Sequence, residues 1–429
     1  MNNPVDKAWH KLDNAAKIFP STSGNSDARV FRFSCELMED VDGNVLQSAL
    51  DRTIDDFPVF QYVMKRGMFW YYLEQSDLRP IVHKENAPPC STIYLDRKTL
   101  LFDVTWYRKR INLEVYHVLS DGTGALQFLK MLVLHYLKLA HPVAMAEISG
   151  VDYDASDAQK MTDSFDKYYD RSKKNSKVKN PAAYQLKGAK EAEWRLKIIE
   201  GSVSTKELLS KAREYGATAT VLITALLMHS IYDEMKVRDR KQPVIITVPV
   251  NLRNFFDSKS TRNFFSIVDI KYDFRRNGDS LEDIIAGVKE GFTERLNEEY
   301  LQARLNKYLS FEKNILIRLV PLTIKNMYMH IAYSFAAREF TAAVSNVGRV
   351  DMPDEAKPYI KLFDVICSTE KLQVCICSYE DTMNISITSP FVSTDIQRNF
   401  FRQLTGMGIA VEISADNSNK KQGESSEIL

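Results

Sequence analysis

The chain has 429 residues, of which 45% are hydrophobic and 26% are charged. This length exceeds one ordinary hydrophobic core, so we expect two domains, and the composition is that of a globular protein. The formal net charge of +1 gives no overall field toward nucleic acid or an anionic membrane. The first twenty residues lack the apolar core of a signal peptide, and no apolar run is long enough to span a membrane. We therefore expect a cytoplasmic protein.

The cysteines give no sign of a metal site. They are Cys35, Cys90, Cys367, Cys375 and Cys377, and no CxxC or HxxxH cluster accompanies them. Cys375 and Cys377 would lie about 6.5 Å apart on one face of a strand, near the limit for a disulfide. We expect all five to be small buried hydrophobes in a reducing compartment.

The first half of the chain begins with a helical pattern. Residues 43–57 carry apolar side chains at helical spacing, and Pro58 ends the helix. Strand-like runs follow, the last of them in "RINLEVYHVL". Its alternation places one set of side chains on a common face: Ile111, Leu113, Val115 and His117. After an Asp-Gly turn, a second apolar stripe predicts a helix that ends before Pro142.

The second half again mixes helices and strands. "STKELLSKAREYG" and "TATVLITALLMHSIYDEM" read as helices, and "QPVIITVPVN" begins as a buried strand. Helical stretches are expected at 280–299 and 301–330. Further strands are expected in "EFTAAVSNVGRV" and "KLQVCICSYEDTMNISITSP".

These patterns favour an α/β or α+β architecture of two similar lobes, with mixed sheets flanked by helices. We expect one lobe over 1–150 and a second over 196–413. The polar segment 151–195 would connect them, and the composition of 414–429 predicts a disordered tail.

His117 is a candidate catalytic residue because Asp121 and Gly122 follow it four and five positions later. A structural reading is available: Asp121 would cap the next helix, worth about 1 kcal/mol, and His117 would be a core histidine. His229 and Asp233 have the same spacing, but within a predicted helix, where it only makes them neighbours. His117 differs because its face is apolar and the chain turns at once. That position suits a neutral base, with Asp121 as an anchor paired to an arginine.

The stretch from His117 to Gly122 resembles the HxxxDG motif of the chloramphenicol acetyltransferase-like superfamily. This group includes condensation domains of peptide synthetases, plant BAHD acyltransferases, wax ester synthases and alcohol acetyltransferases. "VPVNLRNFF", "RNFFSIV" and "AVSNVGRV" are similar to later segments of the same proteins, and the resemblance covers about 1–413. The opening "KLDNAAKIFP" is most similar to bacterial alcohol acetyltransferase-like proteins. Tyr116 replaces the second His of condensation domains, and the DFGWG of BAHD enzymes is missing.

The resemblance implies two α/β lobes with an active-site tunnel between them. His117 would act as general base on an alcohol or amine acceptor, which then attacks an acyl-CoA thioester. Asp121 would be structural and paired with Arg253, and Gly122 would allow a tight turn. Ser345 or Asn346 would stabilise the oxyanion. The coenzyme A thioester would be a co-substrate, with no resident cofactor and no metal.

Several alternatives remain open from the sequence. Arg253 could be an ordinary surface residue, and "SNVG" an ordinary strand end. The acyl donor could be a carrier protein supplied in trans, as for condensation domains. The chain could also be a non-catalytic, condensation-like binding protein.

Overall fold

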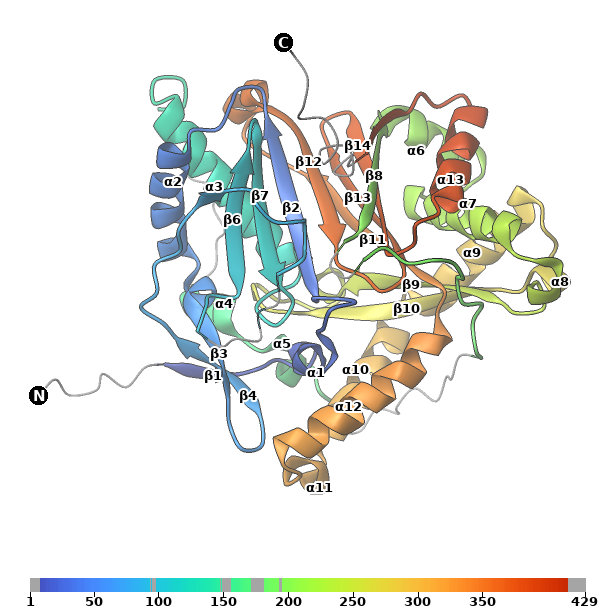
Figure 1. Cartoon of the computed structure of the whole chain (residues 1–429), viewed down its shortest axis with the longest axis horizontal. Coiled ribbons are helices and arrows are strands. Elements are labelled where there is room, and N and C mark those ends of the chain that lie inside the picture. The colour runs from blue at the N-terminus through green and yellow to red at the C-terminus, as the bar shows by residue number, and fades with distance from the viewer. Residues whose placement is uncertain are drawn as a thin grey trace, which may run out of the picture.

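A computed structural model of the chain describes residues 8–92, 94, 98–146, 148, 156–170, 181–192 and 195–415. Figure 1 shows two sheets that lie next to each other in the middle of the molecule, with helices on the outer side of each. The expected mixed α/β architecture of two lobes is confirmed.

The first lobe is built on a five-stranded sheet in the order β12-β2-β7-β6-β5. Its strands are β2 (Val30–Leu37), β5 (His83–Lys84), β6 (Phe102–Tyr107), β7 (Arg110–Tyr116) and β12 (Ile360–Cys367). Helices α2 (Gly43–Asp56) and α3 (Gly122–Ala140) cover its outer side (Figure 1). The Asp42 side chain caps α2 by accepting from two backbone amides of its first turn. A smaller sheet adds β1 (Trp9–Lys11), β4 (Tyr71–Gln75) and β3 (Tyr62–Arg66), and α1 spans Phe19–Thr22.

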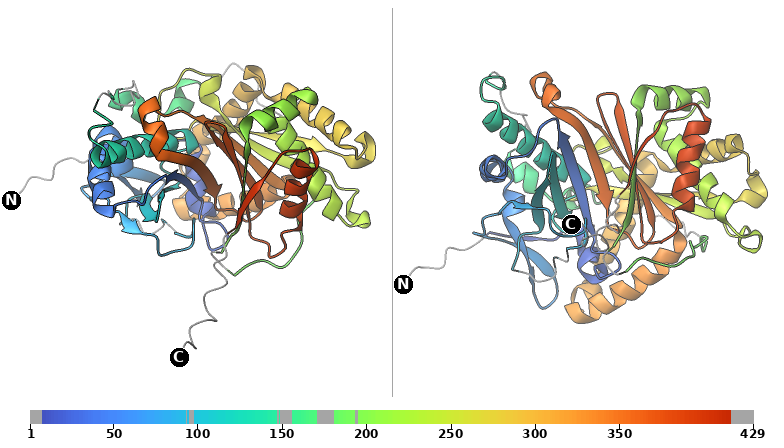
Figure 2. Two further views of the ribbon diagram at one scale, coloured as in Figure 1. Left: turned by 90° about the horizontal axis from the view of Figure 1, so that it is seen from above. Right: turned by 45° about the horizontal axis from the view of Figure 1, so that its top comes forward.

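The second lobe is built on a seven-stranded sheet in the order β10-β9-β11-β13-β14-β8-β15. Its strands are β8 (Lys197–Ser204), β9 (Val244–Asn251), β10 (Phe265–Tyr272), β11 (Ala342–Val350), β13 (Leu372–Tyr379), β14 (Thr382–Ser389) and β15 (Glu412–Ala415). Its helices are α6 (Thr205–Glu214), α7 (Ala219–Glu234), α8 (Phe274–Asn277), α9 (Leu281–Arg295), α10 (Glu298–Lys313), α11 (Ile315–Arg318), α12 (Leu322–Ala336) and α13 (Asp395–Gly406). Figure 2 shows α7 and α13 on the side away from the first lobe.

One strand crosses between the lobes. β12 follows β11 and precedes β13 in sequence, yet it pairs antiparallel with β2 of the first sheet, from Ile360 opposite Leu37 to Cys367 opposite Phe31. The expected division assigned all of 196–413 to the second lobe, so β12 is an exception to it. Pairing with β12 covers an edge of β2 that would otherwise present unpaired backbone groups.

The sheet of the second lobe packs on both faces. Along β13, Cys375, Cys377 and Tyr379 contribute to the core of the first lobe, whereas Val374 and Ile376 contribute to the core of the second. The alternation follows from the period of two of a strand. All five cysteines are free, and all but the partly buried Cys367 are buried.

The helical stretch expected at 301–330 is divided into three. Asn314 ends α10 and caps α11, and Pro321 is the N-cap residue of α12. A proline lacks the amide that a continuous helix would need at this point. The chain therefore turns twice before α12 begins.

The expected connection at 151–195 is described only in parts. These include α4 (Asp157–Met161) and α5 (Ser164–Lys167). Of the expected tail, residues 414 and 415 belong to β15 and the rest lies outside the described residues. Among the helices that the structure describes, none is by itself both long and apolar enough to cross a membrane; only α6 and α7 taken as a pair, bent by 79°, meet that criterion.

Candidate active site

His117 lies directly after the end of β7, and both lobes hold its backbone. Its amide donates to the carbonyl oxygen of Arg29 at 3.0 Å. Its own carbonyl oxygen accepts from Nδ2 of Asn263, at 2.9 Å, just before β10 of the second lobe. The residue is therefore fixed where the two lobes meet.

Aromatic rings surround the imidazole from both lobes. Phe19 of α1 is stacked on it with ring centroids 5.0 Å apart. Phe31 of β2 lies at 4.5 Å and Phe265 of β10 at 6.4 Å. The contact with Phe31 agrees with the expected apolar face. The residue as a whole is partly buried, and its ring is enclosed by aromatic groups of both lobes.

The surroundings keep the imidazole uncharged. Burial lowers the pKa of His117 to about 4, and the effect of Asp121, which favours the charged form, is opposed by Arg29. Nδ1 is buried and has no hydrogen-bond partner among the described residues. Asp121 therefore does not orient the ring by a hydrogen bond, because its carboxylate is engaged elsewhere.

Asp121 joins the two lobes. Its Oδ1 accepts from the amides of Thr123 and Gly124, each at 3.1 Å, and so caps α3. Its Oδ2 accepts from Nη1 of Arg253 at 2.7 Å and from the amide of Phe264 at 2.8 Å. The same carboxylate thus starts a helix of the first lobe and binds the second lobe.

The Nε and Nη2 groups of Arg253 donate hydrogen bonds to the loop before β10. Nη2 donates to the carbonyl oxygens of Ser260 at 2.8 Å and Arg262 at 2.6 Å, and Nε donates to Ser260 at 3.1 Å. The guanidinium is largely buried, with 10% of the side chain exposed. It is not an ordinary surface residue, which the sequence had left open.

The close approach at this turn occurs at Gly124 and not at Gly122. A Cβ at Gly124 would lie 2.1 Å from the carbonyl oxygen of Thr261 and 2.3 Å from Oγ of Ser120. At Gly122 the nearest atom would be a ring carbon of Phe33 at 3.8 Å, which is an ordinary contact. Gly122 also has no positive φ. The structure therefore shows no steric need for glycine at Gly122 itself, and that need falls two residues later, at Gly124.

The two candidates for the oxyanion site point to opposite faces of β11. Ser345 pairs in register with Cys375, whose side chain contributes to the core of the first lobe. Asn346 is exposed, and its Nδ2 donates to Oγ1 of Thr220 in α7, on the helix-covered side. Only Ser345 therefore shares the face that is turned toward the first lobe.

Tyr116 takes the position of the second His of condensation domains and plays a structural part. Its hydroxyl lies 2.9 Å from Oγ of Ser23, and its side chain is fully buried. Burial raises the pKa of this phenol. The phenol of Tyr116 therefore stays neutral, and its hydrogen bond to Ser23 holds the segment between α1 and β2 in place.

Three further residues at the motif were not assigned from the sequence. Asn263 bonds the carbonyl of His117, Ser120 donates through Oγ to the carbonyl of Thr261 at 2.5 Å, and Gly124 allows the loop to approach. Each of these residues acts through a contact with the backbone of another segment, and sequence patterns do not show such contacts. Only their position in or next to the motif segments could have drawn attention to them.

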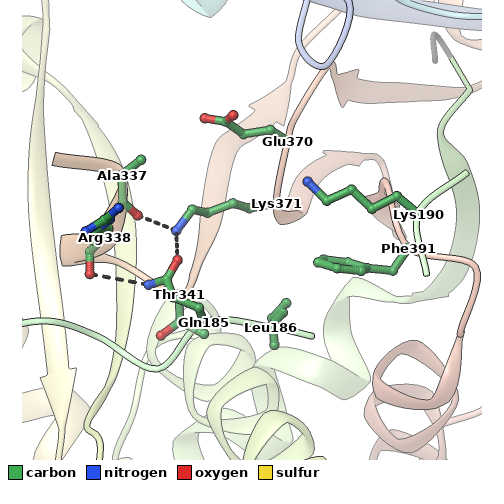
Figure 3. Close-up of a pocket in the computed structure, with 9 residues that line it drawn as sticks. All are labelled: Gln185, Leu186, Lys190, Ala337, Arg338, Thr341, Glu370, Lys371 and Phe391. Carbon is green, nitrogen blue, oxygen red and sulfur yellow. Dashed lines mark hydrogen bonds between the residues drawn. The ribbon is translucent and has the colours of Figure 1, made fainter. Parts of the chain in front are cut away.

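His117 does not line either of two cavities found in the described structure. One has a volume of about 560 Å³ and opens between β1, the β3–β4 hairpin and α10–α11; Arg262 is on its wall. The other, of about 220 Å³, is shown in Figure 3. There Lys371 donates to Oε1 of Gln185 at 2.9 Å and to the carbonyl of Ala337, so its ammonium is already occupied. Within the described residues no group of three or more His, Cys, Asp or Glu could hold a metal ion.

No protein-family model matches the chain, and no curated protein is significantly similar to it in sequence. Solved structures match nearly its whole length. The first condensation domain of the calcium-dependent antibiotic synthetase, in complex with a substrate analogue, matches with a TM-score of 0.64 and 14% identity, over 97% of this chain and 100% of that one.

Two further solved structures agree with this match. Trichothecene 15-O-acetyltransferase from Fusarium sporotrichioides gives a TM-score of 0.62 at 10% identity, over 95% of this chain and 96% of that one. The starter condensation domain of rhizomide synthetase, a mutant in complex with C8-CoA, gives 0.60 at 12% identity, over 93% and 95%. The chain therefore has the fold of these condensation domains and of this acetyltransferase.

Proposed function

We propose that the protein is an acyltransferase in which His117 is the general base. The observation that carries the proposal is the setting of this imidazole, which is uncharged, partly exposed and enclosed by aromatic rings of both lobes. The fold supports it, since solved structures of this shape include an acetyltransferase and condensation domains.

The reaction requires a proton to move twice. His117 accepts the proton of an acceptor hydroxyl or amine, and the freed pair of electrons attacks the carbonyl carbon of a thioester. The tetrahedral oxyanion then collapses, the carbon–sulfur bond breaks, and the thiolate takes the proton back from the imidazolium. A low pKa at His117 favours this last step, because a thiol has a pKa near 8.5. General-base help of this kind contributes about 10²–10⁴-fold to the rate.

Asp121 and Arg253 are positioning residues in this scheme. They hold the turn that carries His117 against the loop before β10. Ser345 is the proposed donor to the oxyanion, because its face of β11 is turned toward the first lobe. We propose acyl-CoA as the donor, which a neighbour bound to C8-CoA supports, and a small alcohol or amine as the acceptor, as in alcohol acetyltransferase-like proteins.

The test measures thiol release from acetyl-CoA and longer acyl-CoA with a panel of alcohols and amines. We expect His117→Ala to lower turnover by about 10²–10⁴-fold. His229→Ala is a matched control, because His229 also has an aspartate four residues later but lies in α7 and bonds Gln403. Circular dichroism checks that both variants fold. Equal turnover in wild type and His117→Ala would contradict the catalytic assignment.

The second candidate is a donor held on a carrier protein in trans. The likeness to condensation domains over the full chain favours it. Rates with acyl-CoA and with the same acyl group on a carrier protein separate the two donors. Absence of thiol release with either donor, together with tight binding of a carrier protein, would instead favour a non-catalytic binding protein.

A further inference from the structure

Most side chains of helix α12 are exposed, including most of the apolar ones. Its apolar side chains recur at helical spacing, and all five members of this stripe are exposed: Ile324, Met327, Tyr328, Ile331 and Phe335. A surface helix of a globular protein normally turns such a stripe toward the core. This stripe instead keeps between 43% and 64% of the surface of each side chain exposed.

The polar side of α12 holds it to the protein. Nδ2 of Asn326 donates to the hydroxyl of Tyr71 at 2.8 Å, and Nζ of Lys325 donates to the carbonyl of Phe69 at 3.1 Å. Tyr333 bonds the carboxylate of Glu370. These contacts fix the rotation of the helix, so the exposure of the stripe is built into the fold.

The exposed surface continues beyond α12. Leu316 and Leu319 lie in and just after α11, with 73% and 66% of their surface exposed, and Met68 of the β3–β4 hairpin is 75% exposed. The amide of Leu322 donates to the carbonyl of Met68 at 2.9 Å, which joins the hairpin to α12. We call Met68, these two leucines and the outer stripe of α12 the apolar edge. Figure 1 shows α11 and α12 along one border of the molecule, beside β4.

The charged residues in the segment that carries most of the apolar edge are all basic. Residues 313–338 contain Lys313, Arg318, Lys325 and Arg338 and no Asp or Glu, although the whole chain carries 57 basic and 56 acidic residues. Lys313 pairs with Asp166. The described residues include no ion-pair partner for the other three cations. Lys325 lies 3.8 Å from the ring centroid of Trp70, where an aromatic group and a cation share the rim.

We propose that the apolar edge rests on an anionic lipid surface. An apolar stripe with aromatic side chains and a rim of lysine and arginine is the chemistry that binds such a surface in its plane. A second copy in the same place would bring the same cations against each other, so self-association fits the charges poorly. The proposal concerns the surface alone and does not depend on the reaction at His117.

The experiment measures flotation of the full chain with vesicles of phosphatidylcholine and with vesicles that also contain phosphatidylglycerol. We expect binding to the second kind and much weaker binding to the first. Leu316→Gln with Met327→Gln should weaken binding by about tenfold or more. The matched control is Val143→Gln with Val237→Gln, since these valines are exposed outside the apolar edge; it should bind as the wild type does.

Charge is tested separately. Arg318→Gln with Arg338→Gln should weaken binding to the anionic vesicles by about thirtyfold, whereas Arg402→Gln with Lys236→Gln should have little effect. Equal flotation on both kinds of vesicle, or equal binding by all variants, would overturn the proposal. So would a dimer that the edge variants convert to monomers, or binding of an acidic carrier protein in place of vesicles. His117→Ala should retain vesicle binding, which separates this result from that on function.

Discussion

Arg253 of the second lobe donates through Nη1 to Oδ2 of Asp121 in the first lobe at 2.7 Å. Both side chains are largely buried, with 10% and 6% exposed. Because Asp121 also caps α3, the pair fixes the helix, the turn that carries His117 and the loop before β10 in one arrangement.

Removing one partner of this pair should destabilise the protein strongly. Arg253→Met leaves the carboxylate of Asp121 buried without its ion pair and frees the carbonyls that the guanidinium held. We expect a loss of about 3–5 kcal/mol in the free energy of unfolding, measured in urea. Asp121→Asn combined with Arg253→Met should lose less than the sum of the single variants. Strictly additive effects would show that the two residues are not coupled.

The pH dependence of acyl transfer should reflect the lowered pKa of His117. Because that pKa is about 4, the base stays unprotonated throughout the neutral range. We expect kcat/KM to be level from neutral pH down to about pH 5 and to fall on further acidification. A decline centred near 6.5, the ordinary value for histidine, would mean that another group is the base or that the ring is more hydrated than described.

The two glycines of the motif should differ in their tolerance of a methyl group. Gly124→Ala places Cβ 2.1 Å from the carbonyl oxygen of Thr261, so the loop before β10 must move. We expect a loss of about 1–3 kcal/mol in the free energy of unfolding and a marked loss of activity. Gly122→Ala meets only Phe33 at 3.8 Å and should change stability much less. If the two variants behave alike in urea unfolding, the close approach is not present.

A carboxyl group between the lobes should make stability depend on pH. Burial and the neighbouring Asp364 of β12 raise the pKa of Glu200 in β8 to about 8, although Arg110 of β7 lies 3.5 Å away. A folded pKa above the unfolded value means that the native state holds the proton longer. Stability is therefore fully present below about pH 4.5 and is lost as pH rises toward about 8, at no more than ~1.4 kcal/mol per pH unit.

Glu200→Gln provides the control for this dependence. The amide does not titrate, so its unfolding free energy should not decline over the same range. Urea unfolding at several pH values compares the two proteins. A wild-type decline that persists unchanged in Glu200→Gln would assign the effect to other groups.

Local patterns predicted the elements around the motif well. The helical spacing of 43–57 and the alternation before His117 correspond to α2 and β7, although β7 is buried on both faces. An arginine partner for Asp121 was expected because a carboxylate in a turn of fixed geometry suits an anchoring ion pair, but the choice of Arg253 came from the family resemblance and not from a local pattern. These inferences needed only short stretches of chain.

Long-range contacts could not be predicted in the same way. The addition of β12 to the edge of the first sheet depends on a pairing between residues more than 300 positions apart. The roles of Asn263 and Gly124 depend on backbone groups of another segment, which leave no periodic signal. The exposure of the α12 stripe was likewise hidden, since the same spacing normally indicates a buried face.

β12 acts as a tether between the lobes. Two short connections, from Val350 to Ile360 and from Cys367 to Leu372, tie it to strands of the other sheet. The two lobes are therefore not independent units joined by one flexible linker. A division of the chain at its middle would leave β12, a strand of the first sheet, in the C-terminal fragment. Any relative movement of the two lobes must therefore also be accommodated by these two connections.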